Sequence, residues 1–76
     1  MRITQYMWCV VNGYGMHSSM VATKFEDEVC RVVYADEESA DPWIQVESID
    51  PKFYGSGKHT VHASQCSPLP KGWKKP

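Results

Sequence analysis

Residues 23–35, with the sequence TKFEDEVCRVVYA, decide the fold of this chain, because they fit a helix and a strand almost equally well. Thr23 and Glu26 have the T-x-x-E spacing of a capping box, in which each side chain satisfies a backbone N–H group at a helix start. Apolar residues then recur at i, i+4 and i+7 from Phe25, which draws one apolar stripe along a helix. The stretch therefore predicts an amphipathic helix at about residues 24–35.

The competing interpretation of the same stretch is a strand. Val29, Val32, Val33 and Tyr34 form strands more readily than helices. The order of charges favours the helix, because acidic residues at the start of the stretch suit the positive end of a helix dipole. If residues 18–25 and 28–35 are instead both strands, the sequence predicts an all-β small barrel of the SH3 type.

The rest of the chain reads as strands and turns. Asn12-Gly13 is a strong signal for a hairpin turn, because both residues tolerate a positive φ. Combined with the helix, four expected strands give a ββαββ order, an antiparallel sheet with one helix on a face and hence an α+β fold. The expected strands are Ile3–Val11, His17–Ala22, Trp43–Asp50 and His59–Ala63.

The length of 76 residues predicts one small domain. We assign residues 1–66 to a single α+β domain and residues 67–76 to a tail rich in proline and lysine, expected to be extended and mobile. A chain of this size buries only about 60% of its unfolded surface, so homo-oligomerisation would be an ordinary way to add buried area.

The number and spacing of the cysteines and histidines argue against a disulfide scaffold, a metal site and a catalytic site. Three cysteines are an odd number, and no signal peptide or membrane-spanning run is visible, so we expect reduced thiols, a cytoplasmic location and no membrane partner. No pair has metal-ligand spacing, and no nucleophile has an evident base, so the sequence predicts no metal, no cofactor and no enzyme activity. A zinc site assembled from distant segments stays an alternative, with these candidates: Cys9, Cys30, Cys66, His17, His59 and His62.

Charge is unevenly distributed along the chain, although its net value is only −1. Residues 1–25 carry a charge of +2, residues 26–50 carry −8 and residues 51–76 carry +5. Asymmetry of this kind bears on the choice of partners more than on the fold.

The acidic block supports the first functional hypothesis, in which carboxylates on the helix and its following loop engage a basic protein surface. Such a protein would act without catalysis, as an inhibitor that mimics DNA toward a nucleic-acid-binding protein. The residues expected to bind the partner are Asp27, Asp36, Glu37, Glu38 and Asp41, with Trp43 as an aromatic anchor at the rim.

The basic tail supports the alternative hypothesis, a small nucleic-acid-binding module that uses aromatic residues of the sheet together with the C-terminus. Lys71, Lys74 and Lys75 would contact phosphates, and Trp73 would stack on a base. Against this hypothesis, the central acidic block would repel the same phosphates.

Three segments together resemble many short uncharacterised proteins of bacteriophages and mobile elements. They are residues 8–13 (WCVVNG), 21–26 (VATKFE) and 43–47 (WIQVE), and they span the expected hairpin, helix start and third strand. The resemblance implies a small accessory protein of a phage, acting in the cytoplasm of the host, and some such proteins block host factors. It assigns no functional residue to this chain.

Overall fold

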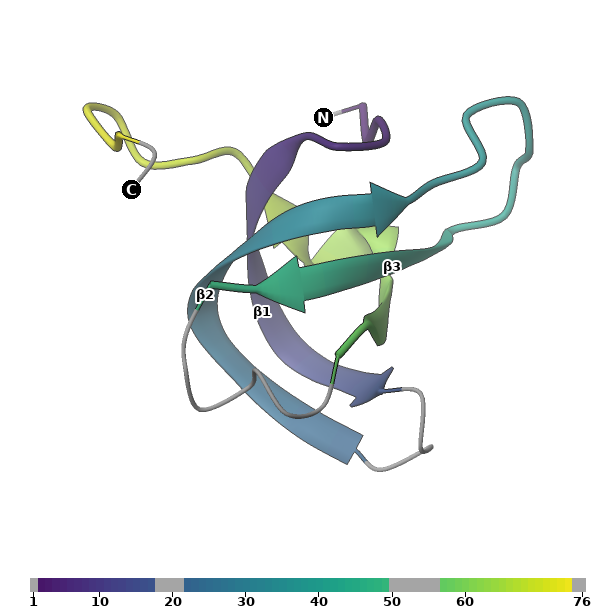
Figure 1. The fold of residues 1–76 in the computed structure, drawn as a ribbon, viewed down its shortest axis with the longest axis horizontal. Coiled ribbons are helices and arrows are strands. Elements are labelled where there is room, and N and C mark those ends of the chain that lie inside the picture. The colour runs from purple at the N-terminus through teal and green to yellow at the C-terminus, as the bar shows by residue number, and fades with distance from the viewer. Residues whose placement is uncertain (1, 18–21, 50–56, 75–76) are drawn as a thin grey trace.

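A computed structural model of the chain describes residues 2–17, 22–49 and 57–74 (Figure 1). Within these residues the fold is almost entirely β-sheet, with one short 3-10 turn, so the expected α+β class is wrong. No helix among the described residues is long and apolar enough to cross a membrane. The elements are β1 (Trp8–His17), β2 (Ala22–Tyr34), β3 (Trp43–Ser48), β4 (His59–His62), η2 (Ala63–Gln65) and β5 (Cys66–Ser67).

The stretch expected to be a helix is the longest strand of the molecule. β2 pairs antiparallel with β1 through residues 22–31 and with β3 through residues 30–34, so residues 30 and 31 have partners on both edges. Its β-branched residues suit a strand with partners on both sides, and this tertiary pairing outweighs the local capping signal. Thr23, expected to cap the helix, lies opposite Gly15 in the β1–β2 ladder.

A bulge in β2 explains why the strand looked helical. The β1–β2 register shifts between Val11 and Gly13, so that β2 holds one more residue than β1 there. The inward-facing residues of β2 therefore change from odd to even positions, from Phe25 to Cys30 and Val32, all fully buried. When the inward-facing positions of a strand change from odd to even, its apolar residues no longer alternate strictly with polar ones. The spacing of these apolar residues then resembles the apolar stripe of a helix.

The expected hairpin turn at Asn12-Gly13 is also wrong. Both residues lie inside β1, which continues to His17, and the β1–β2 connection falls at residues 18–21, outside the described residues. Gly13 does adopt a positive φ of 111°. Gly13 adopts that conformation where the β1–β2 pairing is irregular, opposite the bulge of β2. At the same place the Asn12 side-chain amide donates a hydrogen bond of 3.0 Å to Asp27 Oδ1.

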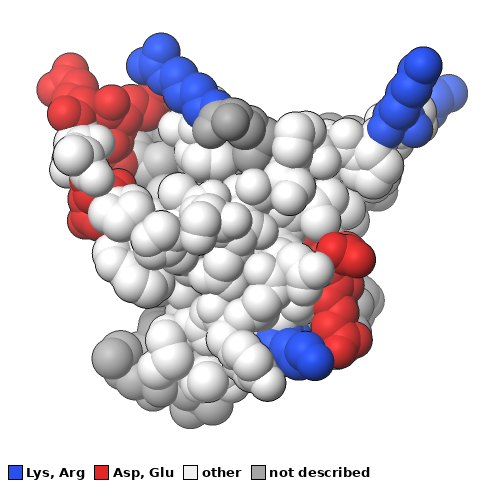
Figure 2. All heavy atoms as spheres, turned by 180° about the vertical axis from the view of Figure 1, so that it is seen from behind, with Lys and Arg blue, Asp and Glu red and all other residues white. Residues whose placement is uncertain are grey.

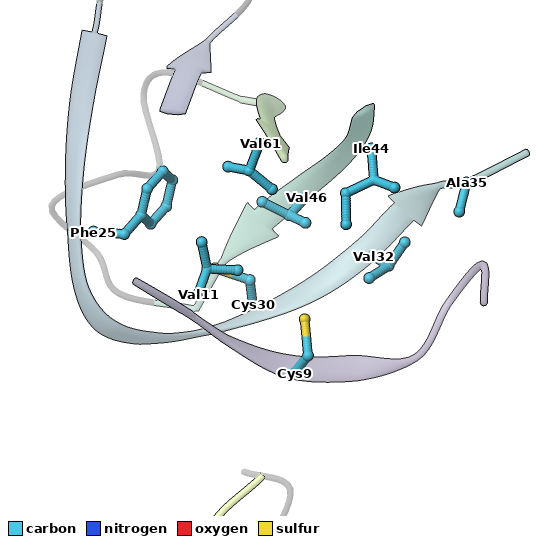
Figure 3. Packing of buried hydrophobic residues seen from close by; sticks show 9 residues of the cluster. All are labelled: Cys9, Val11, Phe25, Cys30, Val32, Ala35, Ile44, Val46 and Val61. Atoms are coloured by element: carbon cyan, nitrogen blue, oxygen red, sulfur yellow. The ribbon is translucent and has the colours of Figure 1, made fainter. Parts of the chain in front are cut away.

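The strands form a closed ring. β1 pairs with β2, β2 with β3, β3 with β4 and β4 with β1, and the two-residue β5 lies beside β1. Side chains that point inward from this ring make one core (Figure 3). Its buried apolar members are Cys9, Val11, Phe25, Cys30, Val32, Ala35, Ile44, Val46 and Val61. The all-β alternative therefore describes the fold class of the described residues better than the helix did.

The third and fourth expected strands are confirmed. In β3 the buried face carries Ile44, Val46 and Ser48, as the alternation predicted. In β4 Val61 is fully buried and lies opposite Ile44. Both strands were expected to extend slightly too far, because β3 ends at Ser48 and β4 ends at His62.

A short segment after β4 returns the chain to β1. In η2, the Gln65 side-chain amide donates a hydrogen bond of 2.6 Å to the carbonyl oxygen of Tyr14, and its Oε1 accepts one of 2.8 Å from the His62 N–H. One side chain thus links the end of β4 to β1. It also sets the direction in which β5 and the C-terminal segment leave the barrel.

Gly15 is the tightest point of the barrel, and we predict that enlarging it destabilises the fold. A Cβ atom there would lie 2.6 Å from Val61 Cγ1 and 3.0 Å from Phe25 Cε2. Gly15→Ala should therefore lower the free energy of unfolding by about 1–3 kcal/mol, measured by urea denaturation. Tyr14→Ala, at the neighbouring outward position with 68% exposure, is the control and should cost about 1 kcal/mol or less. Equal losses in the two variants would contradict the packing described.

Candidate functional site

The carboxylates expected to form one acidic array lie in two groups. Asp27 is on the bulge of β2 with a φ of 52°, whereas Asp36, Glu37, Glu38 and Asp41 are exposed in the loop between β2 and β3. Seven residues of extended chain, at about 3.3 Å each, separate Asp27 from the end of β2. Figure 2 shows acidic side chains gathered at two distant places on the surface.

Several of these carboxylates have local structural roles. Asp36 Oδ1 accepts a hydrogen bond of 3.1 Å from the Glu38 N–H, and Asp41 Oδ1 accepts one of 3.0 Å from the Trp43 N–H. Such contacts are the usual way in which aspartates stabilise turns. Glu37 Oε1 lies 3.8 Å from Arg2 Nη2, a pair exposed to solvent.

Trp43, expected as an aromatic anchor, is 53% exposed at the start of β3. Its ring meets the ring of His62 edge to face, with a centroid distance of 5.1 Å. Trp43 thus lies beside the acidic loop but on a different strand from Asp27, and its closest aromatic neighbour belongs to β4.

The basic tail is brought onto the barrel by an aromatic contact. The ring of Trp73 lies against the ring of Trp8, at a centroid distance of 5.9 Å and an interplanar angle of 37°. A turn at Gly72, with a φ of 86°, and a hydrogen bond of 3.0 Å from the Trp73 N–H to the Pro70 carbonyl shape the segment. Exposed Lys71 and Lys74 flank Trp73, whereas Lys75 lies outside the described residues.

Two further residues extend this contact across the start of β1. Arg31 is the cross-strand partner of Trp8, so both side chains share the outer face of the barrel. The Arg31 guanidinium carbon lies 5.0 Å from the centroid of the Tyr6 ring, within cation–π range. We call this set the aromatic–basic face, and it consists of Tyr6, Trp8, Arg31, Lys71, Trp73 and Lys74.

The aromatic–basic face lies away from the acidic loop. In Figure 1 the C-terminal segment and the β2–β3 loop leave the barrel on opposite sides, and in Figure 2 basic side chains project both next to the larger acidic group and on the side opposite to it. Repulsion from exposed carboxylates falls off over about 8–10 Å at physiological salt, so that loop affects this face little. Glu47 on β3 is the other cross-strand partner of Arg31, so one carboxylate does lie next to this face.

Sequence reasoning found the tail residues of this face and missed the barrel residues. Trp8 falls in the expected strand Ile3–Val11, for which no outer face was assigned, and in the structure it is half-buried while its neighbour Cys9 faces the core. Strict alternation from Cys9 to Val11 would have placed Trp8 on the outer face. The position of Tyr6 depends on its N–H, which donates a hydrogen bond of 2.7 Å to the Val32 carbonyl, and the sequence carries no signal for it.

The three cysteines, far apart in sequence, lie together in the structure as reduced thiols. Cys9 and Cys30 are direct cross-strand partners, and the thiols of Cys9 and Cys66 are hydrogen-bonded. That bond lowers the pKa of Cys9 and raises the pKa of Cys66, which donates it. Burial raises the pKa of Cys30 to about 12, helped by the nearby Cys9 and Glu28.

The buried Cys30 predicts a loss of stability at alkaline pH. Its pKa is about 12 in the folded protein and about 8.5 in an unfolded chain, so between these values the unfolded state loses a proton that the folded state keeps. Stability should therefore fall as pH rises through this window, by up to about 1.4 kcal/mol per pH unit for this group. Cys30→Ala should show a shallower fall in urea denaturation between pH 9 and 11. The same slope in both proteins would contradict the assignment.

The two histidines with described side chains, His59 and His62, do not join the thiols in a metal site. His59 is fully buried against Phe25, whereas His62 lies on the outer face beside Trp43, so the two point to opposite faces of β4. The side chain of His17 lies outside the described part of the structure. Among the described residues, no group of three histidine, cysteine or acidic side chains is arranged to hold a metal ion.

No family model, curated protein or solved structure matches this chain. Function is therefore inferred from the residues and their geometry.

Proposed function

We propose that this protein is a small, non-enzymatic module that binds single-stranded nucleic acid on the aromatic–basic face. The observation that carries the proposal is the contact between Trp73 and Trp8, with ring centroids 5.9 Å apart. It joins the basic C-terminal segment to the aromatic residues at the start of β1.

The residues of this face match what a single strand presents. Exposed bases stack on aromatic rings irrespective of sequence, and phosphates attract lysine and arginine. Tyr6 is 59% exposed, so its ring is accessible to a base, and Arg31 lies beside it. Trp8 and Trp73 are half-buried against each other, with tilted rings that a base could contact at their open faces.

Docking of an acidic array to a basic protein is less well supported. That hypothesis required carboxylates crowded on a helix and its adjoining loop, and residues 24–34 are instead strand. Asp27 is held in the bulge by Asn12, and Asp36 and Asp41 hold the backbone of their own loop. The loop and Trp43 remain exposed but form a smaller surface than the hypothesis needs.

The proposal predicts that Trp73→Ala weakens binding to a fluorescent single-stranded oligonucleotide by about tenfold, since stacking contributes roughly 1–3 kcal/mol per base. Fluorescence anisotropy measures the affinity. Trp43→Ala, at an exposed tryptophan near the acidic loop, is the matched control and should leave the affinity unchanged. Circular dichroism of both variants checks that the barrel is folded.

Salt dependence gives a second readout in the same assay. If Arg31, Lys71 and Lys74 contact three phosphates, the affinity for single strands should fall with salt at a log–log slope of about −2. The double variant Lys71→Gln, Lys74→Gln should flatten that slope, and Glu47→Gln should strengthen binding. Absence of binding at low salt, or equal losses for Trp73→Ala and Trp43→Ala, would refute the proposal.

A further inference from the structure

The thiol cluster connects three parts of the chain that are distant in sequence. Cys9 lies on β1, Cys30 on β2 and Cys66 on β5. In Figure 3 the side chain of Cys9 points from β1 into the core, toward Val32 and the strands beyond it. Cys66 lies opposite Val11 in the β1–β5 ladder and packs against the same core. The nucleic-acid proposal makes no use of these thiols.

We propose that Cys9 and Cys66 are a site of reversible disulfide formation when the folded protein meets a low-molecular-weight disulfide such as oxidised glutathione. Cys66 lies opposite Val11, so Cys9, two residues along β1, is its diagonal neighbour on the inward side of the two strands. The two thiols also share a hydrogen bond. β5 consists of two residues, so it can shift to bring the two Cβ atoms to the separation of about 3.8 Å that a disulfide needs.

Exposure decides which sulfur reacts first. Cys9 and Cys30 are fully buried, whereas Cys66 is partly exposed at the edge of the barrel. The Cys66 sulfur, as thiolate, attacks one sulfur of oxidised glutathione. A mixed disulfide forms, the glutathione S–S bond breaks, and one glutathione thiolate leaves and takes up the proton lost by Cys66.

The contact between thiols decides which cysteine completes the exchange. The Cys9 sulfur attacks the Cys66 sulfur of the mixed disulfide, the Cys9–Cys66 bond forms, and the second glutathione leaves as thiolate and takes the proton of Cys9. Overall, two protein thiols are oxidised and one glutathione disulfide is reduced to two thiols. Cys30 is the poorer partner, because its thiol is directed to the Glu28 carbonyl, 3.7 Å away.

The bond would tie the start of β5 to β1 covalently. The segment that leaves β5 carries Trp73 to its contact with Trp8, so the disulfide fixes the base of that segment. A link between residues 9 and 66 also closes a long loop of the unfolded chain, which is the condition under which a disulfide stabilises most. We expect oxidation to raise the melting temperature by roughly 10 °C, reversibly on reduction.

Peptide mapping after trypsin digestion tests the proposal directly. Cleavage after lysine and arginine places Cys9, Cys30 and Cys66 in three different peptides, residues 3–24, 25–31 and 59–71. The folded, full-length protein is incubated for hours with oxidised glutathione, because the raised pKa of Cys66 slows the first attack. Remaining thiols are then alkylated and the digest is analysed by mass spectrometry. We expect residues 3–24 joined to residues 59–71.

Three variants separate the possible pairings. Cys30→Ala should keep the disulfide and the rise in melting temperature, whereas Cys9→Ala should stop at the mixed disulfide on Cys66. Cys66→Ser should stay reduced. A bond between residues 3–24 and 25–31, a mixed disulfide that persists in the unchanged protein, or no reaction would each overturn the proposal. These readouts do not involve nucleic acid, so their outcome is independent of the proposed function.

Discussion

The bulge in the middle of β2 is the constraint on which the rest of the structure depends. β2 pairs with β1 through residues 22–31, on both sides of the bulge, and with β3 through residues 30–34 on its other edge. The extra residue near Asp27 bends the strand within the stretch that pairs with β1. Aspartate tolerates the left-handed conformation better than most residues, and Asn12 holds its carboxylate from the neighbouring strand. Because β2 bends, the sheet curves, and this curvature favours closure of the ring through β3 and β4.

Closure of the ring determines which residues are available for binding. Once one side of each strand faces a shared core, side chains such as Trp8 and Arg31 are left on the outside as cross-strand neighbours. Gln65 then directs the returning chain past β1, so that Trp73 meets Trp8 and brings two lysines with it. Figures 1 and 2 show the acidic loop on the other side of the barrel. The acidic loop and the basic C-terminal segment, which are separate blocks of the sequence, thus also lie apart in space, whereas the acidic residues of β2 and β3 do not share the side of that loop.

Local sequence patterns predicted the elements whose phase stays constant. β3 and β4 alternate without interruption, and their buried residues Ile44, Val46 and Val61 could be assigned from the pattern alone. The buried residues of β2 could not be assigned in this way, because the bulge changes its inward residues from odd to even positions. In addition, acidic residues occupy the bend and imitate the start of a helix. The Asn12-Gly13 pair wrongly predicted a hairpin turn for a related reason. The positive φ of Gly13 fits the ladder of β1 opposite the bulge and not a turn.

The candidate site was predictable in part for the same physical reasons. Lysines around a tryptophan in a proline-rich segment suit nucleic-acid contact in any fold, so the tail residues of the proposed site could be named from the sequence. Their partners on the barrel depend on long-range pairing, as does the meeting of Cys9 with Cys66, and no local spacing encodes either. The acidic residues had the stronger signal in composition, yet several are used to shape a bulge and a loop.

The most direct test of this account maps the bound strand onto the protein. Amide and indole NMR signals of the isotope-labelled chain would be followed while a single-stranded oligonucleotide is added at low salt. The account predicts that the largest shifts occur at Tyr6, Trp8, Arg31 and residues 71–74, with little change at residues 36–43. Shifts concentrated in residues 36–43, or absent throughout at millimolar oligonucleotide, would contradict it.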